Sequence, residues 1–116
     1  MDNKSFERFE LEVMKRIARE NPSIEKALRR QYEEAVIVSR EFTGAGFFTT
    51  FEVGDKSLQL EGIINDTFGN VQAIFEELEY GVGFALFVRG GFIEILEGYT
   101  YGELWPSEIT LYELVD

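Results

Sequence analysis

Carboxylates and tyrosines gather late in the sequence, where they could do chemistry. Glu94 and Glu97 precede Tyr99 and Tyr101, and Glu103 follows them. Paired carboxylates can act as general acid and base or hold a hard cation, and nearby phenols can donate hydrogen bonds. However, Glu94 and Glu97 are an odd number of residues apart, so on one strand they would point to opposite faces, and no calcium-loop spacing is present. We therefore expect no catalytic residue and no metal site here, but a solvated acidic rim or a protein-binding surface.

The composition removes most other routes to catalysis. The 116-residue chain contains no histidine and no cysteine. Histidine is the commonest general base and metal ligand, and cysteine supplies disulfides, zinc thiolates and nucleophiles. With 11 Lys and Arg against 22 Asp and Glu, the formal net charge is −11. Because phosphate groups must be neutralised by Lys and Arg, we expect the chain to bind neither nucleic acid nor an anionic membrane. Because the usual catalytic and metal-binding residues are missing, we also expect a non-enzymatic protein without a cofactor.

The negative charge is concentrated in the second half of the chain. Residues 59–116 contain 11 acidic residues and a single basic one, Arg89, whereas residues 1–58 are nearly balanced. Arg89 could form an internal ion pair with Glu94 or Glu97. A one-sided charge distribution can steer a cationic partner, although it can also simply keep a phenylalanine-rich chain in solution. The acidic residues expected to face such a partner are Glu76, Glu77, Glu79, Glu94, Glu97, Glu103 and Glu108.

Three aromatic residues in the same region are candidate anchors for a protein partner. Tyr99, Tyr101 and Trp105 stand among turn residues, and tyrosine and tryptophan dominate the energetics of many protein interfaces. Trp105 has an alternative role, because it could instead close the end of a hydrophobic core.

Two Gly-x-Gly-Phe motifs, at 44–47 and 81–84, could suggest phosphate-binding loops. Neither continues with the third glycine of a dinucleotide-binding motif, and neither is followed by a Walker lysine or a helix. Isolated glycines in sheets usually mark bends or bulges. We therefore expect the two motifs to lie where the chain enters a strand.

The elements that must position these residues follow from hydrophobic periodicity. Apolar residues three and four apart predict an amphipathic helix over 5–20, and Asn21 and Pro22 suit the start of a second helix that ends near residue 34. β-Branched, aromatic and alternating runs predict strands over 35–42, 47–53, 58–64, 71–78, 84–89, 92–97 and 109–115. The run 71–78 is ambiguous, since part of it would also suit a helix.

The clearest turn is the pair Gly90 and Gly91, which can take the positive φ angles of a two-residue hairpin. Such a turn would place Val88 opposite Ile93, Leu86 opposite Ile95 and Phe87 opposite Glu94. Together these elements predict one domain, residues 1–116, of the α+β class. A helical pair, residues 1–34, would pack on one face of an antiparallel, meander-like sheet of about five to six strands formed by residues 35–116.

The N-terminal residues have no apolar core and no cleavage site typical of a signal peptide. No window approaches the roughly 18 uncharged apolar residues that a membrane-spanning helix needs. We therefore expect a cytoplasmic protein.

Three stretches carry a resemblance to other sequences. The segments 40–49, 81–91 and 96–106 contain the patterns GxGFF, GxGFxLFVRxG and LEGYTYGExWP. In these patterns the chain resembles a scattered group of small stand-alone bacterial proteins that carry no assigned activity. In size, acidity and lack of catalytic groups it is also similar to bacterial toxin-immunity proteins, such as those of contact-dependent growth inhibition systems, which bind and block a cognate toxin domain. This second resemblance is one of type and implies no role for any particular residue.

The sequence therefore predicts an acidic protein-binding or immunity protein that neutralises a cationic partner such as a nuclease toxin. A nuclease must present a positive cleft to bind phosphates, and an acidic protein complements that cleft while its field accelerates encounter. The alternative is a small-molecule-binding or regulatory domain with an apolar aromatic pocket, in which the charge serves only solubility. Whether the chain is a monomer or a homodimer stays open.

Overall fold

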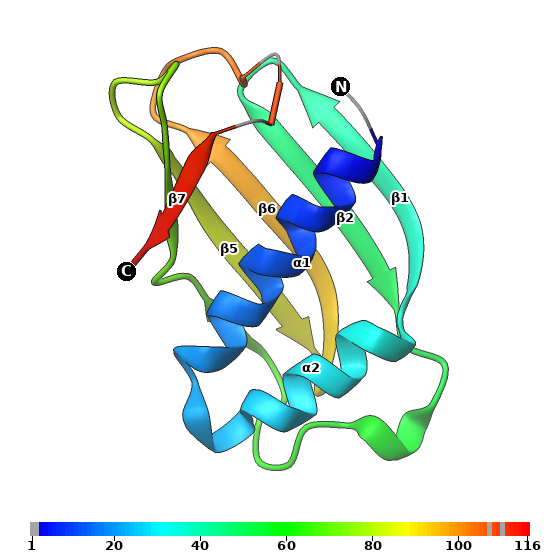
Figure 1. Ribbon diagram of the computed structural model, residues 1–116. Coiled ribbons are helices and arrows are strands. Elements are labelled where there is room, and N and C mark those ends of the chain that lie inside the picture. Colours follow the sequence, from blue (N-terminus) through cyan, green and yellow to red (C-terminus); the bar gives the residue numbers. More distant parts are fainter. Residues whose placement is uncertain (1–2, 107, 110) are drawn as a thin grey trace.

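In the computed structural model, two helices precede a seven-stranded antiparallel sheet and cover one of its faces (Figure 1). The structure describes residues 3–106, 108–109 and 111–116. Helix α1 spans Asn3–Arg19 and α2 spans Glu25–Glu34, with a short 3-10 helix, η1, at Pro22–Ile24 between them. The predicted α+β class, with a helical pair packed on an antiparallel sheet, is confirmed.

The sheet is built around two long hairpins. Its strands are β1 Val36–Thr43, β2 Gly46–Glu52, β3 Asp66–Phe68, β4 Gln72–Phe75, β5 Val82–Arg89, β6 Phe92–Thr100 and β7 Tyr112–Val115. Their order is β1-β2-β6-β5-β4-β7, and β3 pairs with β5. The sheet thus has more strands than expected, and it departs from a meander because β2 neighbours β6. This order places β4 beside β7 and brings their connecting segments to one end of the sheet.

Helix α1 supplies the centre of the hydrophobic core. Its residues Phe6, Phe9, Val13 and Ile17 recur three and four positions apart, and all four are buried against the sheet. The ring of Phe9 is central, with centroid distances of 4.9–6.3 Å to the rings of Phe75, Phe84, Trp105 and Tyr112. Burial of this aromatic cluster fixes the helix on the sheet.

The second helix begins later than expected. Asn21 does not cap it; its side-chain amide instead donates to the carbonyl of Ile17 at 2.8 Å and so closes the end of α1. Pro22 starts η1, and α2 begins directly after Ile24, at Glu25. The inner face of α2 carries Leu28, which is buried.

Gly90 and Gly91 form the predicted turn between β5 and β6. Their φ angles are 62° and 83°, in the left-handed region that glycine enters without steric cost. Val88 lies opposite Ile93, as the two-residue turn predicts.

Beyond that first pair, the predicted register of the hairpin is wrong. Leu86 pairs with Leu96 rather than Ile95, and Phe87 pairs with Ile95 rather than Glu94. Glu94 is an extra residue in β6, and such a bulge shifts the register of the strand by one position. The expectation that Glu94 and Glu97 point to opposite faces assumed a regular strand between them. The bulge breaks that regular alternation, so the odd spacing no longer assigns the two side chains to opposite faces.

The segment 58–64 is not a strand, contrary to expectation. Gly62 has a φ of 75°, which ends any extended run, and the amide of Leu60 donates to the carbonyl of Gly91 at 2.9 Å. The buried Gln31 side chain holds the segment from the other side by donating to the carbonyls of Leu58 and Gly91, at 2.8 and 2.9 Å. The strand in this region, β3, forms a few residues later.

Two further strand predictions are confirmed in shortened form. The ambiguous run 71–78 is a strand over Gln72–Phe75, after which the chain turns. The run 109–115 forms β7 over Tyr112–Val115, and Thr110 lies outside the described residues.

Candidate protein-binding surface

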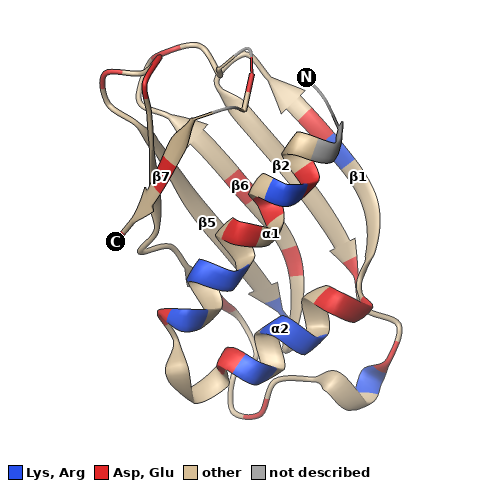
Figure 2. Cartoon of the chain, in the orientation of Figure 1, with Lys and Arg blue, Asp and Glu red and all other residues tan. Residues whose placement is uncertain are grey.

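Acidic residues of two connecting segments, β4–β5 and β6–β7, lie at one end of the sheet (Figure 2). We call this group the acidic end; it consists of Glu76, Glu77, Glu79, Glu103 and Glu108. All are exposed except Glu103, which is half-buried. Five of the seven acidic residues predicted to face a partner therefore come together in space, although up to 32 positions separate them in the sequence.

Large hydrophobic side chains are exposed within and beside the acidic end. The exposed fractions are 61% for Tyr80, 47% for Tyr101, 79% for Leu104 and 70% for Leu111. In a soluble monomer, exposed apolar groups that cluster and are rimmed by polar residues commonly mark protein-binding sites. The acidic end thus combines charge with apolar contact area.

A small notch lies between the two connecting segments. It has a volume of about 140 Å³ and is lined by Phe75, Glu76, Glu77, Glu108 and Leu111. Among the residues that the structure describes, no three acidic side chains are close enough to hold a metal ion. The notch suits a long basic side chain better, because its stem could lie on Phe75 and Leu111 while its charge meets the carboxylates.

Glu103 organises the acidic end. Its carboxylate accepts hydrogen bonds from the backbone amides of Glu79, at 3.1 Å, and Tyr80, at 2.9 Å. Its carbonyl accepts from the hydroxyl of Thr100. Glu103 therefore ties the β4–β5 connection to the end of β6, and its charge is already engaged within the chain.

Replacing Glu103 by alanine should loosen this tie without unfolding the protein. We expect the amides of Glu79 and Tyr80 to exchange with solvent about tenfold faster, because each loses a charge-assisted hydrogen bond. Hydrogen exchange measured by NMR tests this directly. Glu108→Ala is the matched control, since Glu108 makes no hydrogen bond with a described residue, and it should leave both rates unchanged; equal acceleration in the two variants would contradict the role of Glu103.

The remaining predicted binding residues lie elsewhere. Glu94 is at the opposite end of the sheet, beside the β5–β6 turn, where it pairs with Arg89 at 3.6 Å. This confirms one of the two partners proposed for Arg89. Glu97 lies in the middle of β6, opposite Phe48 and Ala85, on the face that the helices leave uncovered.

The three predicted aromatic anchors divide between surface and core. Trp105 packs against Phe47 with a centroid distance of 5.2 Å and also against Phe9 and Phe75, so it takes the core position given as its alternative. Tyr99 and Tyr101 form an edge-to-face pair at 5.6 Å, and the Tyr99 ring and the Tyr101 hydroxyl lie over Gly83, where a Cβ atom would be 2.6–2.7 Å from them.

The two Gly-x-Gly-Phe motifs lead into strands. Gly46 and Gly83 lie at the starts of β2 and β5, as predicted, and each allows atoms of β6 or the segment after it to approach its backbone closely. A Cβ atom at Gly46 would lie 2.0 Å from the carbonyl oxygen of Gly98, whereas Gly83 makes room for Tyr99 and Tyr101.

Sequence interpretation missed a buried charged network under α1. Glu10 is fully buried and accepts hydrogen bonds from Tyr32 at 2.8 Å, Thr49 at 2.6 Å and Arg40 at 2.8 and 3.2 Å. The hydrogen bond to Glu10 raises the pKa of Arg40, and burial, reinforced by the charge of Glu10, raises the pKa of Tyr32. Glu10 has four donors and no exposed surface, so it joins α1 to α2, β1 and β2 rather than contacting solvent or ligand. Its place on the apolar stripe, four residues after Phe6, was the available signal.

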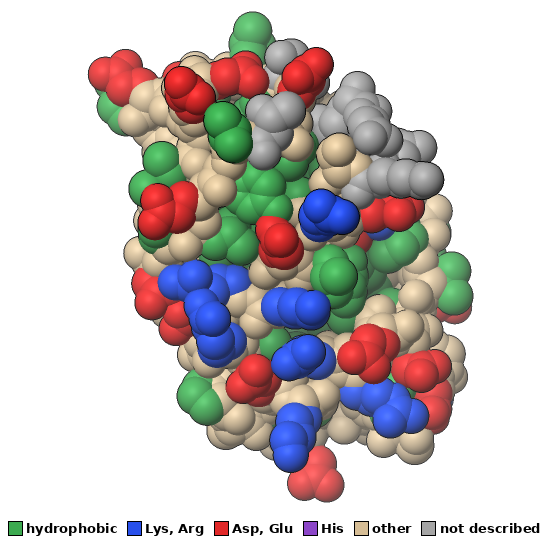
Figure 3. Space-filling model, in the orientation of Figure 1, with side chains coloured by type: hydrophobic (Ala, Val, Ile, Leu, Met, Phe, Trp, Pro, Cys, Tyr) green, Lys and Arg blue, Asp and Glu red, His purple; other side chains and the backbone are tan. Residues whose placement is uncertain are grey.

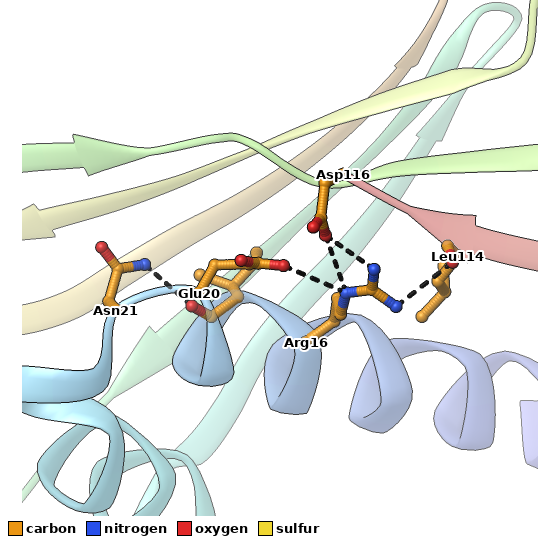
Figure 4. Close-up of polar contacts among 6 residues, drawn as sticks. Arg16, Glu20, Asn21, Leu114 and Asp116 are labelled. Atoms are coloured by element: carbon orange, nitrogen blue, oxygen red, sulfur yellow. Dashed lines mark hydrogen bonds and ion pairs between the residues drawn. The ribbon is translucent and has the colours of Figure 1, made fainter.

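Positive charge gathers on the helices, away from the acidic end. Figure 3 shows basic side chains across the two helices, with acidic ones among them, and acidic side chains along the end of the sheet. An open groove of about 490 Å³ between the helices and β7 is lined by both charge signs, with basic residues in excess. Within it Arg16 binds Asp116 at 2.6 Å and also contacts Glu20 and the carbonyl of Leu114 (Figure 4).

The comparisons with known proteins found no matching family model, curated protein or solved structure. Among the residues that the structure describes, no helix is both long and apolar enough to cross a membrane.

Proposed function

We propose that the chain is a cytoplasmic, non-enzymatic binding protein that uses the acidic end to occlude a cationic protein partner. The observation that carries this proposal is the convergence of exposed carboxylates and exposed apolar side chains from two separate connecting segments. An immunity protein that blocks a nuclease toxin is the specific form that we favour, because the positive cleft of a nuclease has the complementary charge.

The separation of charge across the molecule supports a defined docking orientation. A cationic partner is attracted to the acidic end and repelled by the basic side chains on the helices, so the field orients the two proteins before contact. The notch then offers a place for one basic side chain of the partner. Tyr80 and Leu104, one on each connecting segment, supply further exposed apolar area.

The alternative of a small-molecule pocket has less support. The apolar recess between the helices, lined mainly by Leu11, Met14, Leu28 and Tyr32, has a volume of about 20 Å³. Ligand pockets usually enclose several hundred Å³. This recess is too small to hold an organic ligand without rearrangement of the helices.

A capture experiment with charge-matched variants tests the proposal. The wild-type protein and two triple variants are immobilised on separate columns, and a lysate of the producing organism is passed over each at low salt. Proteins released by high salt are identified by mass spectrometry. One variant reverses Glu76, Glu77 and Glu108 to lysine, and the control reverses the exposed residues Glu33, Glu52 and Glu61. Both carry a net charge of −5, since each of three reversals adds two charges to −11.

We expect a basic protein to be retained by the wild type and the control, and reduced about tenfold or more on the acidic-end variant. Equal loss from both variants would mean that net charge alone drives binding, and would overturn the proposal. Equal retention by all three proteins would do the same.

A further inference from the structure

The face of the sheet opposite the helices is apolar at its centre. We call it the helix-free face; its central residues are Phe48, Ala85, Phe87, Ile95, Glu97 and Tyr99, and all are half-buried. The strand register fixes their neighbours, because Phe48 and Ala85 flank Glu97 while Phe87 lies opposite Ile95. Both helices lie on the other side of the sheet (Figure 1). The edge-to-face pair of Tyr99 and Tyr101 extends the apolar area toward the acidic end.

Glu97 stands out in this setting. It is half-buried between Phe48 and Ala85, yet it forms no hydrogen bond and no ion pair with any residue that the structure describes. The basic residue of β5, Arg89, lies four positions beyond Ala85, about 13 Å along the strand, and is paired with Glu94. Burial raises the pKa of the adjacent Tyr99, with Tyr101 and Glu97 acting in the same direction.

An apolar partner without a positive charge would fit this face poorly. Covering Glu97 with apolar groups would remove water from a carboxylate that has no other partner, which is costly. A second copy centred on Glu97 would fit poorly as well, because a twofold axis there would bring Glu97 and Glu41 of one molecule against the same residues of the other, and each chain has a formal net charge of −11. Charge complementarity therefore selects a different protein.

We infer that the helix-free face docks an amphipathic helix of a protein partner that carries a Lys or Arg in the middle of its apolar stripe. The apolar side chains of that helix would pack on Phe48, Phe87 and Ile95, and its central Lys or Arg would form an ion pair with Glu97. This inference rests on the proposed protein-binding function and adds a second contact surface to the acidic end, with Tyr99 and Tyr101 between the two.

The test uses two synthetic amphipathic helices of about 18 residues, about 27 Å long, built from leucine and lysine. They are identical except that one carries lysine and the other leucine at the centre of the apolar stripe. Binding to isotope-labelled protein is followed by NMR, which gives both the affinity and the position of the contact. The peptides are titrated into the wild type, Glu97→Gln and the matched control Glu113→Gln, an exposed residue of β7.

We expect the central-lysine peptide to shift the amides of Phe48, Phe87 and Ile95 and to bind the wild type about tenfold more tightly than the central-leucine peptide. Glu97→Gln should abolish that preference, whereas Glu113→Gln should keep it. Shifts confined to the acidic end, or a preference that survives in Glu97→Gln, would overturn the inference. Concentration-dependent dimers in sedimentation that disappear in Phe87→Lys would overturn it too, because the occupant would then be a second copy.

These outcomes are separable from those of the capture experiment. If the acidic-end variant loses the captured protein but the peptide preference is absent, the proposed function stands and the second surface fails. If the peptide preference is present but the acidic-end variant retains the captured protein, the proposed function fails in its present form.

Discussion

Replacing Glu10 by alanine should lower the free energy of unfolding by about 3–5 kcal/mol. The variant removes the carboxylate that pairs with Arg40 inside the protein, so a half-buried guanidinium loses its close partner. Tyr32 and Thr49 lose a hydrogen-bond acceptor at the same time, and unsatisfied buried polar groups add to the cost. Denaturant unfolding followed by circular dichroism measures the loss.

Glu7 provides the control for this prediction. It lies on the same helix and also faces Arg40, at 3.8 Å, but its side chain is 59% exposed. Exposed ion pairs contribute little, so Glu7→Ala should change stability by less than about 0.5 kcal/mol. A loss below about 1 kcal/mol for Glu10→Ala would show that the buried network does not hold α1 on the sheet.

Replacing Gly98 by alanine should destabilise the protein by about 3 kcal/mol through overpacking. A Cβ atom at this position would lie 2.2 Å from a ring carbon of Phe47. Phe47 is fully buried, and its ring is held by Phe6 at 4.8 Å and Trp105 at 5.2 Å, so it has little room to move. The expected result is a large fall in the melting temperature.

Gly54→Ala is the matched control, since a Cβ atom there has nothing within 4 Å and the backbone is not left-handed. Its stability should stay within about 0.5 kcal/mol of the wild type. If Gly98→Ala were equally harmless, the close packing of Phe47 on β6 would not contribute to the stability of the core.

The elements that the sequence predicts best are those specified by short-range patterns. The stripe from Phe6 to Ile17 and the turn at Gly90 and Gly91 depend on periodicity and on left-handed φ angles, and both are present in the structure. The bulge at Glu94 could not be predicted, because an extra strand residue leaves no compositional trace. The alternation over 58–64 also predicted a strand. In the structure, hydrogen bonds from the Gln31 side chain to the carbonyls of Leu58 and Gly91 hold this segment in another conformation.

The composition of the acidic end was predictable, but its assembly was not. An excess of carboxylates after residue 59 is visible in the sequence. That Glu76 and Glu108 lie beside one notch depends on β4 pairing with β7, a long-range choice that local patterns do not encode. Glu94 and Glu97 are close to Glu103 in the sequence, but they lie at the start and in the middle of β6, so the extended strand holds them away from the acidic end.

The roles of single residues also depended on the structure. Trp105 offered two roles in the sequence, and only its ring contacts with Phe9, Phe47 and Phe75 place it in the core. Glu103 looked like one more surface charge, but its carboxylate binds two backbone amides. The sequence does not distinguish these roles, because a tryptophan can lie in a core or at an interface and a glutamate can face solvent or bind backbone amides.

The most direct test of the central claim is the association rate constant of the captured basic protein, measured by surface plasmon resonance between low and high salt. For the wild type and for the Glu33, Glu52 and Glu61 control, the rate should fall about tenfold or more as salt screens the field. The variant with Glu76, Glu77 and Glu108 reversed should associate slowly at every salt concentration. If the two charge-matched variants instead associate at the same rate throughout, the acidic end does not guide binding, which contradicts the proposed function.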